Sequence, residues 1–350
     1  MNKIVIVNKA RQLYEIIRKD ILDGEKYKVG DKLPSIRDLA REYDLNKNTV
    51  NTVISMLVSD GLVSVREGAG TYITFKKQEI RLIGVMLFDF CTGMRVDTDI
   101  LKYIQMNLPG NYYLSLMDTS NRFDVFCDGL SRLCDMDAQG FLIIPPKDYP
   151  QPEALERAKA LLMNRPTVMI NRTIAGIETD SYSMNLGKGI EKAFEYLFTL
   201  GKRSTAIVLH DDSKFINEEL RAYTKCCMEY GLTFRKDFLI DFSSDPAVID
   251  EQVRGILPQI DSIIAPDDIL VQIRSTLQID GRKVPQDFSL IGINDTTYSK
   301  LFNPPLTSIA FPTEKIARSA IHRLIQRIEG NADLPIETIN FEPELIIRNT

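Results

Sequence analysis

The sequence predicts an α/β protein in two parts, with a small N-terminal segment of helices and a hairpin ahead of a larger segment built on doubly wound parallel sheets. Apolar residues follow a helical spacing up to about residue 60, whereas short apolar runs separated by helical patterns recur from residue 80 onward. Alternation of strands and helices predicts parallel sheets that are buried on both faces. The length of 350 residues exceeds one typical domain and accommodates two such sheets.

The composition is that of a globular protein, with 44% hydrophobic and 26% charged residues. No run of about 18 apolar residues occurs, so we expect no membrane span. The N-terminus lacks the apolar core and cleavage site of a signal peptide, which favours the cytoplasm. The cysteines number five and form no CxxC pair, so we expect buried free thiols and neither a disulfide framework nor a structural metal site.

Charge is distributed unevenly along the chain. Residues 1–78 hold 14 basic and 10 acidic residues, a net charge of +4, and the remaining residues hold 29 basic and 38 acidic residues, a net charge of −9. This mild asymmetry favours a module that binds a polyanion, joined to a body with another role.

Three helices are expected in the N-terminal segment. The first covers residues 9–23 and ends at Gly24, the second begins after Ser35 in a pattern like a capping box, and the third begins after the N-cap Asn46 and ends at Gly61. Their apolar faces are Leu13, Ile16, Ile17 and Ile21, then Ile36, Leu39, Ala40 and Tyr43, and finally Val50, Val53, Ile54 and Leu57.

The stretch LVSVREGAGTYIT, which follows the third helix, predicts a β-hairpin with a glycine turn. Helix, helix, turn, helix and hairpin is the layout of a winged helix-turn-helix, whose recognition helix points its N-terminal residues at the bases of the major groove. The polar face of the third helix carries Asn48 and Asn51, and an asparagine amide pairs with adenine through two hydrogen bonds. Lys47, Arg37 and Arg66 supply positive charge. The alternative is a solvated face on an ordinary three-helix bundle.

The sequence of residues 30–73 resembles the GntR family of bacterial transcription regulators. It reads GDKLPSIRDLAREYDLNKNTVNTVISMLVSDGLVSVREGAGTYI. It matches the family's G-x-x-LPS-x-R-x-LA run, the T-V of the third helix, L-x-x-x-GL and the G-x-GT of the wing. The family usually has arginine where Lys47 and Asn51 stand, and this difference favours an A·T-leaning half-site. The residues expected to contact DNA are Ser35, Arg37, Asn46, Lys47, Asn48, Thr49, Asn51, Arg66, Gly68 and Gly70.

The larger segment contains repeated apolar runs that predict buried strands. They cover residues 80–88, 140–146, 166–171, 204–210, 261–266 and 287–295. Ligands of such sheets bind beyond the carboxyl ends of the strands. The residues directly after the runs are rich in amides, carboxylates and aromatic rings, which is what a polyhydroxylated ligand requires. Ordinary polarity of exposed loops is the alternative interpretation.

Residues 80–350 resemble the sugar-responsive half of the LacI/GalR repressors, with the type I periplasmic-binding-protein fold. The elements that carry the resemblance are G-x-x-VP-x-D-x-S-x-IG, PPLTSI and the segment NLGKGIEKAFEYLFTLGKRSTAIVL. A GntR-like head on a LacI-like body resembles the arabinose-repressor branch of GntR regulators. The resemblance places Asn294 at the position of a ligand-contacting aspartate, and it places Glu219 at that of a sugar-binding arginine. The residues expected to contact the ligand are Phe88, Asp89, Phe90, Asn171, Arg172, Glu219, Arg221, Asp267, Asn294 and Asp295.

The expected organisation is a winged helix-turn-helix domain over residues 1–75, a linker over 76–80 and a ligand-binding and dimerisation domain over 81–350. Within that domain, the first lobe is expected at about 81–175 and 313–332. The second lobe is expected at about 176–312 and 333–350.

Together these features imply a cytoplasmic, sequence-specific transcription regulator, more specifically a repressor. The expected partners are a pseudo-palindromic DNA operator, a second copy of the chain in a homodimer, and a monosaccharide or derivative bound between the lobes; no cofactor and no membrane are expected. A DNA-binding regulator whose body only dimerises is the alternative. A Rossmann-like enzyme is disfavoured because the chain has only two histidines and lacks the GxGxxG and GxxxxGK[ST] motifs.

Overall fold

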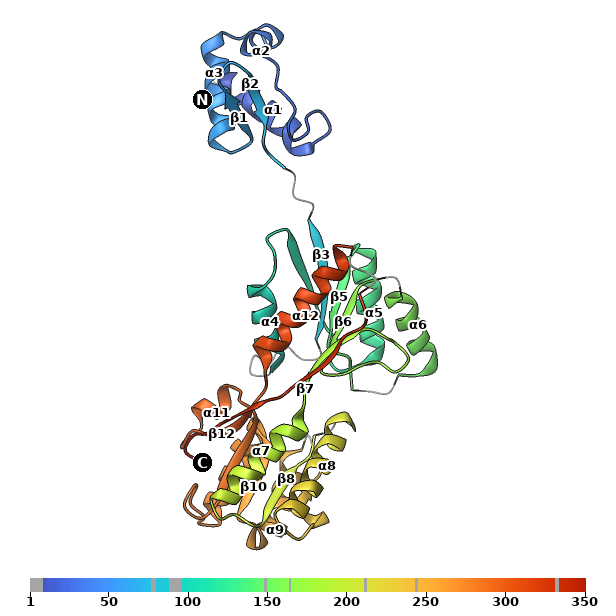
Figure 1. Ribbon diagram of the computed structural model, residues 1–350, viewed down its shortest axis with the longest axis vertical. Helices are drawn as coiled ribbons and strands as arrows, with labels where there is room; N and C mark the ends of the chain where they lie inside the picture. The colour runs from blue at the N-terminus through green and yellow to red at the C-terminus, as the bar shows by residue number, and fades with distance from the viewer. Residues whose placement is uncertain are drawn as a thin grey trace, which may run out of the picture. The chain divides into compact units, whose positions relative to one another are not determined.

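The computed structural model describes residues 9–76, 80–87, 96–147, 150–163, 165–210, 213–242, 245–330 and 334–350. These residues fall into two units that divide after Ile80 (Figure 1). Across the described ranges, every helix is too short or too polar to span a membrane. We describe each unit by itself.

The first unit contains the three expected helices and the hairpin. Its elements are α1 (Lys9–Asp23), α2 (Ile36–Glu42), α3 (Lys47–Ser59), β1 (Val63–Arg66) and β2 (Gly70–Ile73). The strands β1 and β2 pair in antiparallel fashion. The predicted apolar face of α3 is buried, but that of α1 needs a correction, because Ile16 is 44% exposed and Tyr14 is buried instead.

The second unit is built on two sheets, as predicted, and each has six strands. The first sheet has the order β13-β7-β6-β5-β3-β4, and all its strands are parallel. Its strands are β3 (Arg81–Leu87), β4 (Tyr112–Asp118), β5 (Gly140–Ile143), β6 (Thr167–Ile170), β7 (Asp180–Met184) and β13 (Thr338–Phe341). The helices α4 (Val96–Met106) and α12 (Thr313–Ile328) share one hydrophobic cluster with this sheet, and α5 (Phe123–Asp135) and α6 (Pro152–Leu162) pack on its other face.

The second sheet has the order β14-β12-β11-β10-β8-β9, in which only the β12–β14 pair is antiparallel among the described strands. Its strands are β8 (Thr205–Val208), β9 (Leu239–Ile240), β10 (Ser262–Pro266), β11 (Ser289–Asn294), β12 (Thr307–Ala310) and β14 (Glu344–Ile346). Its helices are α7 (Leu186–Thr199), α8 (Ser213–Glu229), α9 (Pro246–Ile256), α10 (Asp267–Ile279) and α11 (Thr297–Leu301), with 3-10 turns at Lys236–Phe238 and Leu257–Gln259.

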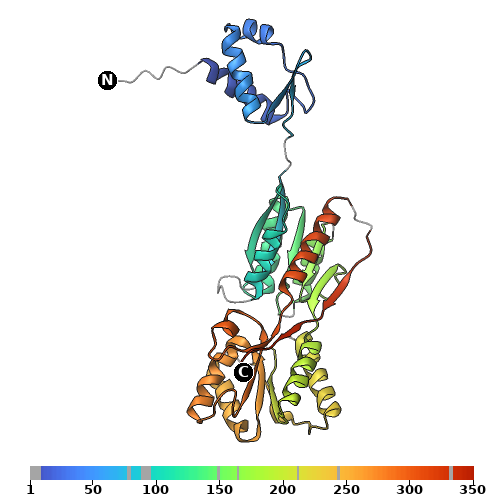
Figure 2. The same ribbon diagram turned by 60° about the vertical axis from the view of Figure 1, so that its left-hand side comes forward.

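The two sheets repeat one topology, in which the first strand of each lobe lies between its second and third strands. In the described part of the chain, the connections from one lobe to the other follow β7, β12 and β13. The last of these connections lies in the red C-terminal segment and can be followed in Figures 1 and 2. The expected lobe limits at about 176 and 333 therefore need correction. Hydrogen bonds hold β7 and β13 in the first sheet, so the chain crosses from the first lobe to the second after Met184 and again after Phe341.

The cysteines agree with the expectation of free thiols where the structure describes them. Cys127, Cys226 and Cys227 are buried, and Cys134 is half-buried. Burial raises the pKa of the Cys226 thiol to about 12, which keeps it in the unreactive thiol form. Cys91 lies outside the described residues.

Candidate functional site

The N-terminus of α3 is capped by the asparagine that the sequence predicts. The side-chain oxygen of Asn46 accepts hydrogen bonds from the N–H of Thr49 at 2.7 Å and from its hydroxyl at 2.8 Å. These bonds satisfy one of the N–H groups that every helix leaves unpaired in its first turn. Asn46 and Thr49 therefore have a structural role at the start of this helix, whatever else they contact.

The residues that follow the cap present a polar face to solvent. Lys47, Asn48 and Asn51 are exposed, whereas Val50 and Val53 are fully buried on the opposite side of α3. This division follows the helical period of 3.6 residues, because the buried side chains pack against α1 and α2. The amides of Asn48 and Asn51 are consequently available to an external partner.

The helix α2 and the hairpin supply the other residues expected to contact DNA. The Ser35 hydroxyl accepts from the Asp38 N–H at 3.2 Å and caps α2, and Arg37 in the first turn is exposed. Gly68 and Gly70 have φ angles of +72° and +112°, which favour glycine. The hairpin turn therefore lacks side chains at two of its positions.

In the larger unit, Asn171 follows β6 at the carboxyl edge of the first sheet. Its φ of +65° turns the chain away from the strand, a conformation that asparagine tolerates better than most residues. Its side-chain oxygen is buried and has no hydrogen-bond partner among the described residues. A buried polar atom without a partner is costly and calls for an explanation, and a bound ligand would provide one.

The main-chain carbonyl of Asn171 joins the two lobes. Lys214, in the first turn of α8 in the second lobe, donates a hydrogen bond from Nζ to this oxygen at 2.8 Å. Arg172, the next residue along the chain, donates to the carbonyl of Pro145 at 2.9 Å. Lys214 was missed at the sequence level, although its position shortly after the apolar run 204–210 points to the same edge of the second sheet.

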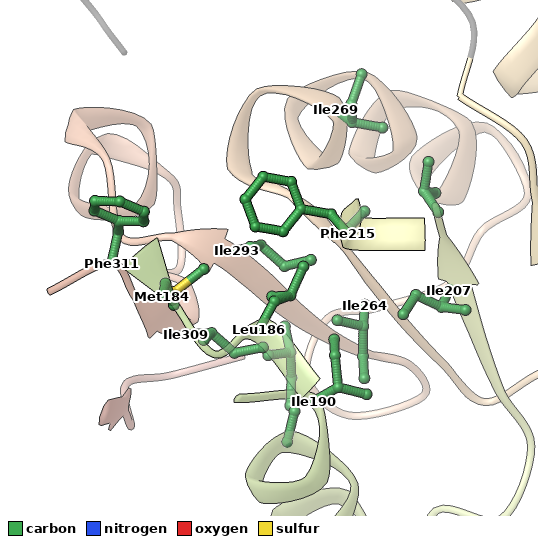
Figure 3. Packing of buried hydrophobic residues seen from close by; sticks show 14 of the residues in the cluster. Met184, Leu186, Ile190, Ile207, Phe215, Ile264, Ile269, Ile293, Ile309 and Phe311 are labelled. Carbon is green, nitrogen blue, oxygen red and sulfur yellow. The ribbon is translucent and has the colours of Figure 1, made fainter. Parts of the chain in front are cut away.

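Glu219 on α8 does not offer its carboxylate to the surroundings. It is fully buried, and it accepts a hydrogen bond from the His210 N–H at 2.9 Å and contacts the His210 ring Nδ1 at 2.6 Å. The pair fixes the ring of His210 two residues after the end of β8. The ring also lies 5.4 Å from that of Phe215, and Figure 3 shows Phe215 in one group of side chains with Ile269 and Ile293.

Arg221 lies apart from the other residues expected at the ligand site. It is exposed, its Nε donates to the Asn217 carbonyl at 2.9 Å, and it lines a hollow on the outer surface of α8 with Lys225 and Met228. Two residues along an α-helix point about 200° apart, so Glu219 and Arg221 face opposite sides. The structure therefore does not bring this arginine to the strand ends.

The third group of expected ligand residues surrounds the carboxyl end of β11. Asp267 is 1% exposed, and its carboxylate accepts hydrogen bonds from the Thr296 N–H at 2.6 Å and from the Ser308 hydroxyl at 2.8 Å. Burial raises the pKa of this carboxyl to about 7, although these hydrogen bonds oppose the shift. Asp295 forms an ion pair with Arg348 at 2.7 Å. Both carboxylates are thus held by partners within the protein.

Among the described residues, the side chain of Asn294 takes no part in the hydrogen bonds and the ion pair that hold Asp267 and Asp295. Asn294 is the last residue of β11, it is half-buried, and its φ is +96°. Phe88, Asp89 and Phe90, expected at the end of β3, lie outside the described residues. Among the residues that the structure describes, no group of three His, Cys, Asp or Glu side chains is placed to hold a metal ion.

Comparison with known proteins matches both units. Residues 9–73 match the family described as "Bacterial regulatory proteins, gntR family", and residues 194–350 match the "Periplasmic binding protein-like domain". The "Arabinose metabolism transcriptional repressor" of Geobacillus stearothermophilus is 23% identical over 98% of this chain and 97% of its own length. Its alignment spans both units.

Two solved structures resemble the fold. The transcription regulator CcpA of Lactococcus lactis has a TM-score of 0.67 at 16% identity, over 77% of this chain and 98% of that protein. The CelR–cellobiose complex has a TM-score of 0.65 at 17% identity, over 91% of this chain and 99% of that protein. The chain therefore combines a gntR-family DNA-binding domain with a periplasmic binding protein-like domain, which is the composition of a bacterial transcription regulator.

Proposed function

We propose that the chain is a cytoplasmic homodimeric repressor that binds a pseudo-palindromic operator and releases it when a monosaccharide or close derivative binds between the lobes. The DNA-binding part is carried by the exposed polar face at the start of α3, where Lys47, Asn48 and Asn51 project next to a capped N-terminus. Two α3 helices related by a dimer axis would read two half-sites about one helical turn apart. Light scattering of the full chain in solution tests the dimer.

The ligand-binding part is carried by the unpartnered oxygen of Asn171 at the end of β6. The hydrogen bond from Lys214 brings the second lobe to this residue, so a ligand there would contact both lobes. Asn294 adds a second amide from the end of β11, and amides suit a polyhydroxylated ligand because they donate and accept. The arabinose repressor and the cellobiose complex among the similar proteins support a sugar.

Ligand control requires a coupling between the two sites. A ligand that favours one arrangement of the lobes changes DNA affinity, and DNA must then change ligand affinity by the same factor. A thermal-shift screen of the full chain against pentoses, hexoses, deoxyhexoses and their phosphates identifies the effector, because binding to the folded state stabilises it. The absence of any hit would favour the alternative, in which the body only dimerises.

We expect Asn51→Ala and Lys47→Ala to affect DNA binding in different ways. Loss of the Asn51 amide removes a base contact, so affinity for an operator selected from a random library falls by about 1–3 kcal/mol while affinity for random duplex changes little. Loss of Lys47 weakens both and reduces the salt slope by about 0.9. Titrations at several salt concentrations measure both effects, and equal losses on the two DNAs for Asn51→Ala would argue against base reading.

We expect Asn171→Gly and Asn294→Gly to abolish the thermal shift produced by the effector without destabilising the protein alone. Glycine adopts the positive φ of both positions readily, and removal of the Asn171 amide also removes a buried acceptor that has no partner among the described residues. Asp137→Gly is the matched control, because Asp137 also has a positive φ but is exposed after α5. A normal shift in both asparagine variants would exclude these side chains from the site.

A further inference from the structure

The wing of the DNA-binding domain is extended by a short third segment. Lys32 forms an isolated antiparallel bridge with Tyr72 of β2, and the N–H of Leu33 donates to the carbonyl of Thr71 at 2.8 Å. The same segment continues into Ser35, the N-cap of α2. The wing and the start of α2 are therefore joined through the residues around Lys32.

Side chains alternate between the two faces of this three-stranded arrangement. Val63, Ile73 and Leu33 are 3%, 2% and 2% exposed and form the inner face against the helices. Lys32 and Arg66 belong to the alternate positions and are exposed. The outer face of the wing thus carries one cation from the third segment and one from β1.

The two cations lie over the same strand. The guanidinium carbon of Arg66 is 4.6 Å from the centre of the Tyr72 ring. The stem of Lys32 crosses Gly70, because a Cβ at that glycine would lie 2.5 Å from the Lys32 Cε and 3.3 Å from its Nζ. Gly70 is also paired directly with Arg66 in the hairpin. A side chain at position 70 would therefore displace the lysine from the neighbourhood of the arginine.

The described acidic groups of the domain form no ion pair with these two cations. The ion pairs in its described part join Arg18 to Glu15, Lys26 to Asp20 and Arg41 to Asp38, and neither Lys32 nor Arg66 takes part in them. Two exposed cations on one face of the wing form a surface that attracts the anionic backbone of DNA.

We propose that Lys32 and Arg66 hold one DNA phosphate between them over Gly70, which makes Lys32 a DNA-binding residue of the wing. The inference rests on the proposed function. The inference extends the proposed function, because it gives the wing a second cation. It also gives Gly70 a role beyond its φ angle, since the absence of a Cβ leaves room for the Lys32 stem. The connection to Ser35 places this contact on the side of the wing next to the start of α2.

The test measures binding of the full chain to a mixed-sequence B-DNA duplex at salt concentrations between about 50 and 200 mM. Lys32→Gln is expected to weaken binding and to reduce the slope of log K against log salt by less than about 0.9, because Arg66 still faces the shared phosphate, whereas the combined variant with Arg66→Gln should reduce the slope by about 0.9. Lys32→Arg should retain the slope, because it keeps the charge. Lys19→Gln, which removes the same charge from the exposed surface of α1, is the matched control and should retain it too.

A double-mutant cycle distinguishes a shared phosphate from two separate contacts. If Lys32 and Arg66 bind the same phosphate, the combined variant Lys32→Gln with Arg66→Gln loses less affinity than the product of the two single losses. An unchanged slope for Lys32→Gln, or strictly multiplicative losses, would overturn the inference while the wild type still binds duplex. Failure of the wild type to bind any duplex would instead overturn the proposed function.

Discussion

Asp180→Asn is expected to lower the free energy of unfolding of the larger unit by about 3–5 kcal/mol, because it removes the buried carboxylate that pairs with the largely buried guanidinium groups of Arg323 and Arg327. Asp180 is fully buried at the start of β7. Its carboxylate accepts from the Glu337 N–H at 2.8 Å, pairs with Arg323 at 3.1 Å and accepts from Nη2 of Arg327 at 3.1 Å. The arginines belong to α12, so this single carboxylate ties the sheet to the helix that covers it.

Urea unfolding followed by far-UV circular dichroism measures the loss. Asp128→Asn is the matched control, because Asp128 forms an ion pair with Arg157 at 2.8 Å in which the two side chains are 59% and 48% exposed; its removal should cost no more than about 1 kcal/mol. A loss for Asp180→Asn no larger than that of the control would show that the buried network contributes nothing specific.

The contribution of Asp180 also depends on pH. Burial alone raises the pKa of this carboxyl, but hydrogen bonds from Arg327, the Glu337 N–H and Arg323 outweigh burial and hold the pKa below its usual value. The ionised form is therefore favoured by folding, so the stabilisation is present above about pH 4 and is lost as the pH falls through the lowered value. Wild type and Asp180→Asn should accordingly approach each other in stability in acid.

The same residue shows why part of the fold was missed at the sequence level. Apolar runs predicted β5, β6, β10 and β11 because those strands are buried and aliphatic. The run Asp180-Ser181-Tyr182-Ser183 is equally buried but polar. Its partners lie far along the chain, since Arg327 is 147 residues and Asn340 is 157 residues away from the groups that they contact. Polar residues that are satisfied over such distances carry no local signal of burial.

The sequence likewise predicts one part of the candidate site and misses another. The rule that ligands bind beyond the carboxyl ends of strands placed Asn171 and Asn294 at those edges, and helical periodicity placed Asn51 on the exposed face of α3. Periodicity also argues against pairing Glu219 with Arg221, which lie on opposite sides of α8. The commitment of the Asp267 carboxylate to Thr296 and Ser308 depends on three strands coming together, and no spacing in the sequence predicts it.

The buried carboxyl of Asp267 should make the stability of the protein depend on pH. Because burial raises the pKa of this carboxyl to about 7, while an unfolded chain has a value near 3.9, the unfolded state releases the proton first as the pH rises. The contribution of Asp267 to the free energy of unfolding should therefore be greatest below about pH 4 and should fall as the pH rises toward 7. The difference of about 3 pKa units corresponds to a loss on the order of 4 kcal/mol.

Asp267→Asn should remove this dependence. The amide oxygen replaces the carboxylate oxygen that accepts from the Thr296 N–H, and the amide N–H donates to the Ser308 hydroxyl in place of the bond that this hydroxyl donates to the carboxylate, so both partners keep a hydrogen bond to residue 267 without a titrating group. The difference in unfolding free energy between the variant and the wild type, measured by urea unfolding from about pH 4 to about pH 8, cancels the groups that both proteins share. The variant should become more stable relative to the wild type as the pH rises.

Asp268→Asn controls for the change of net charge, since Asp268 is the next residue of α10 and is exposed. A difference between Asp267→Asn and wild type that stays constant with pH would show that Asp267 is ionised throughout. In that case the hydrogen bonds from Thr296 and Ser308 would outweigh burial and keep the carboxylate charged. If the difference grows as expected, the carboxyl changes its charge near neutral pH, and effector affinity then depends on pH over the same range to the extent that effector binding shifts the pKa of Asp267.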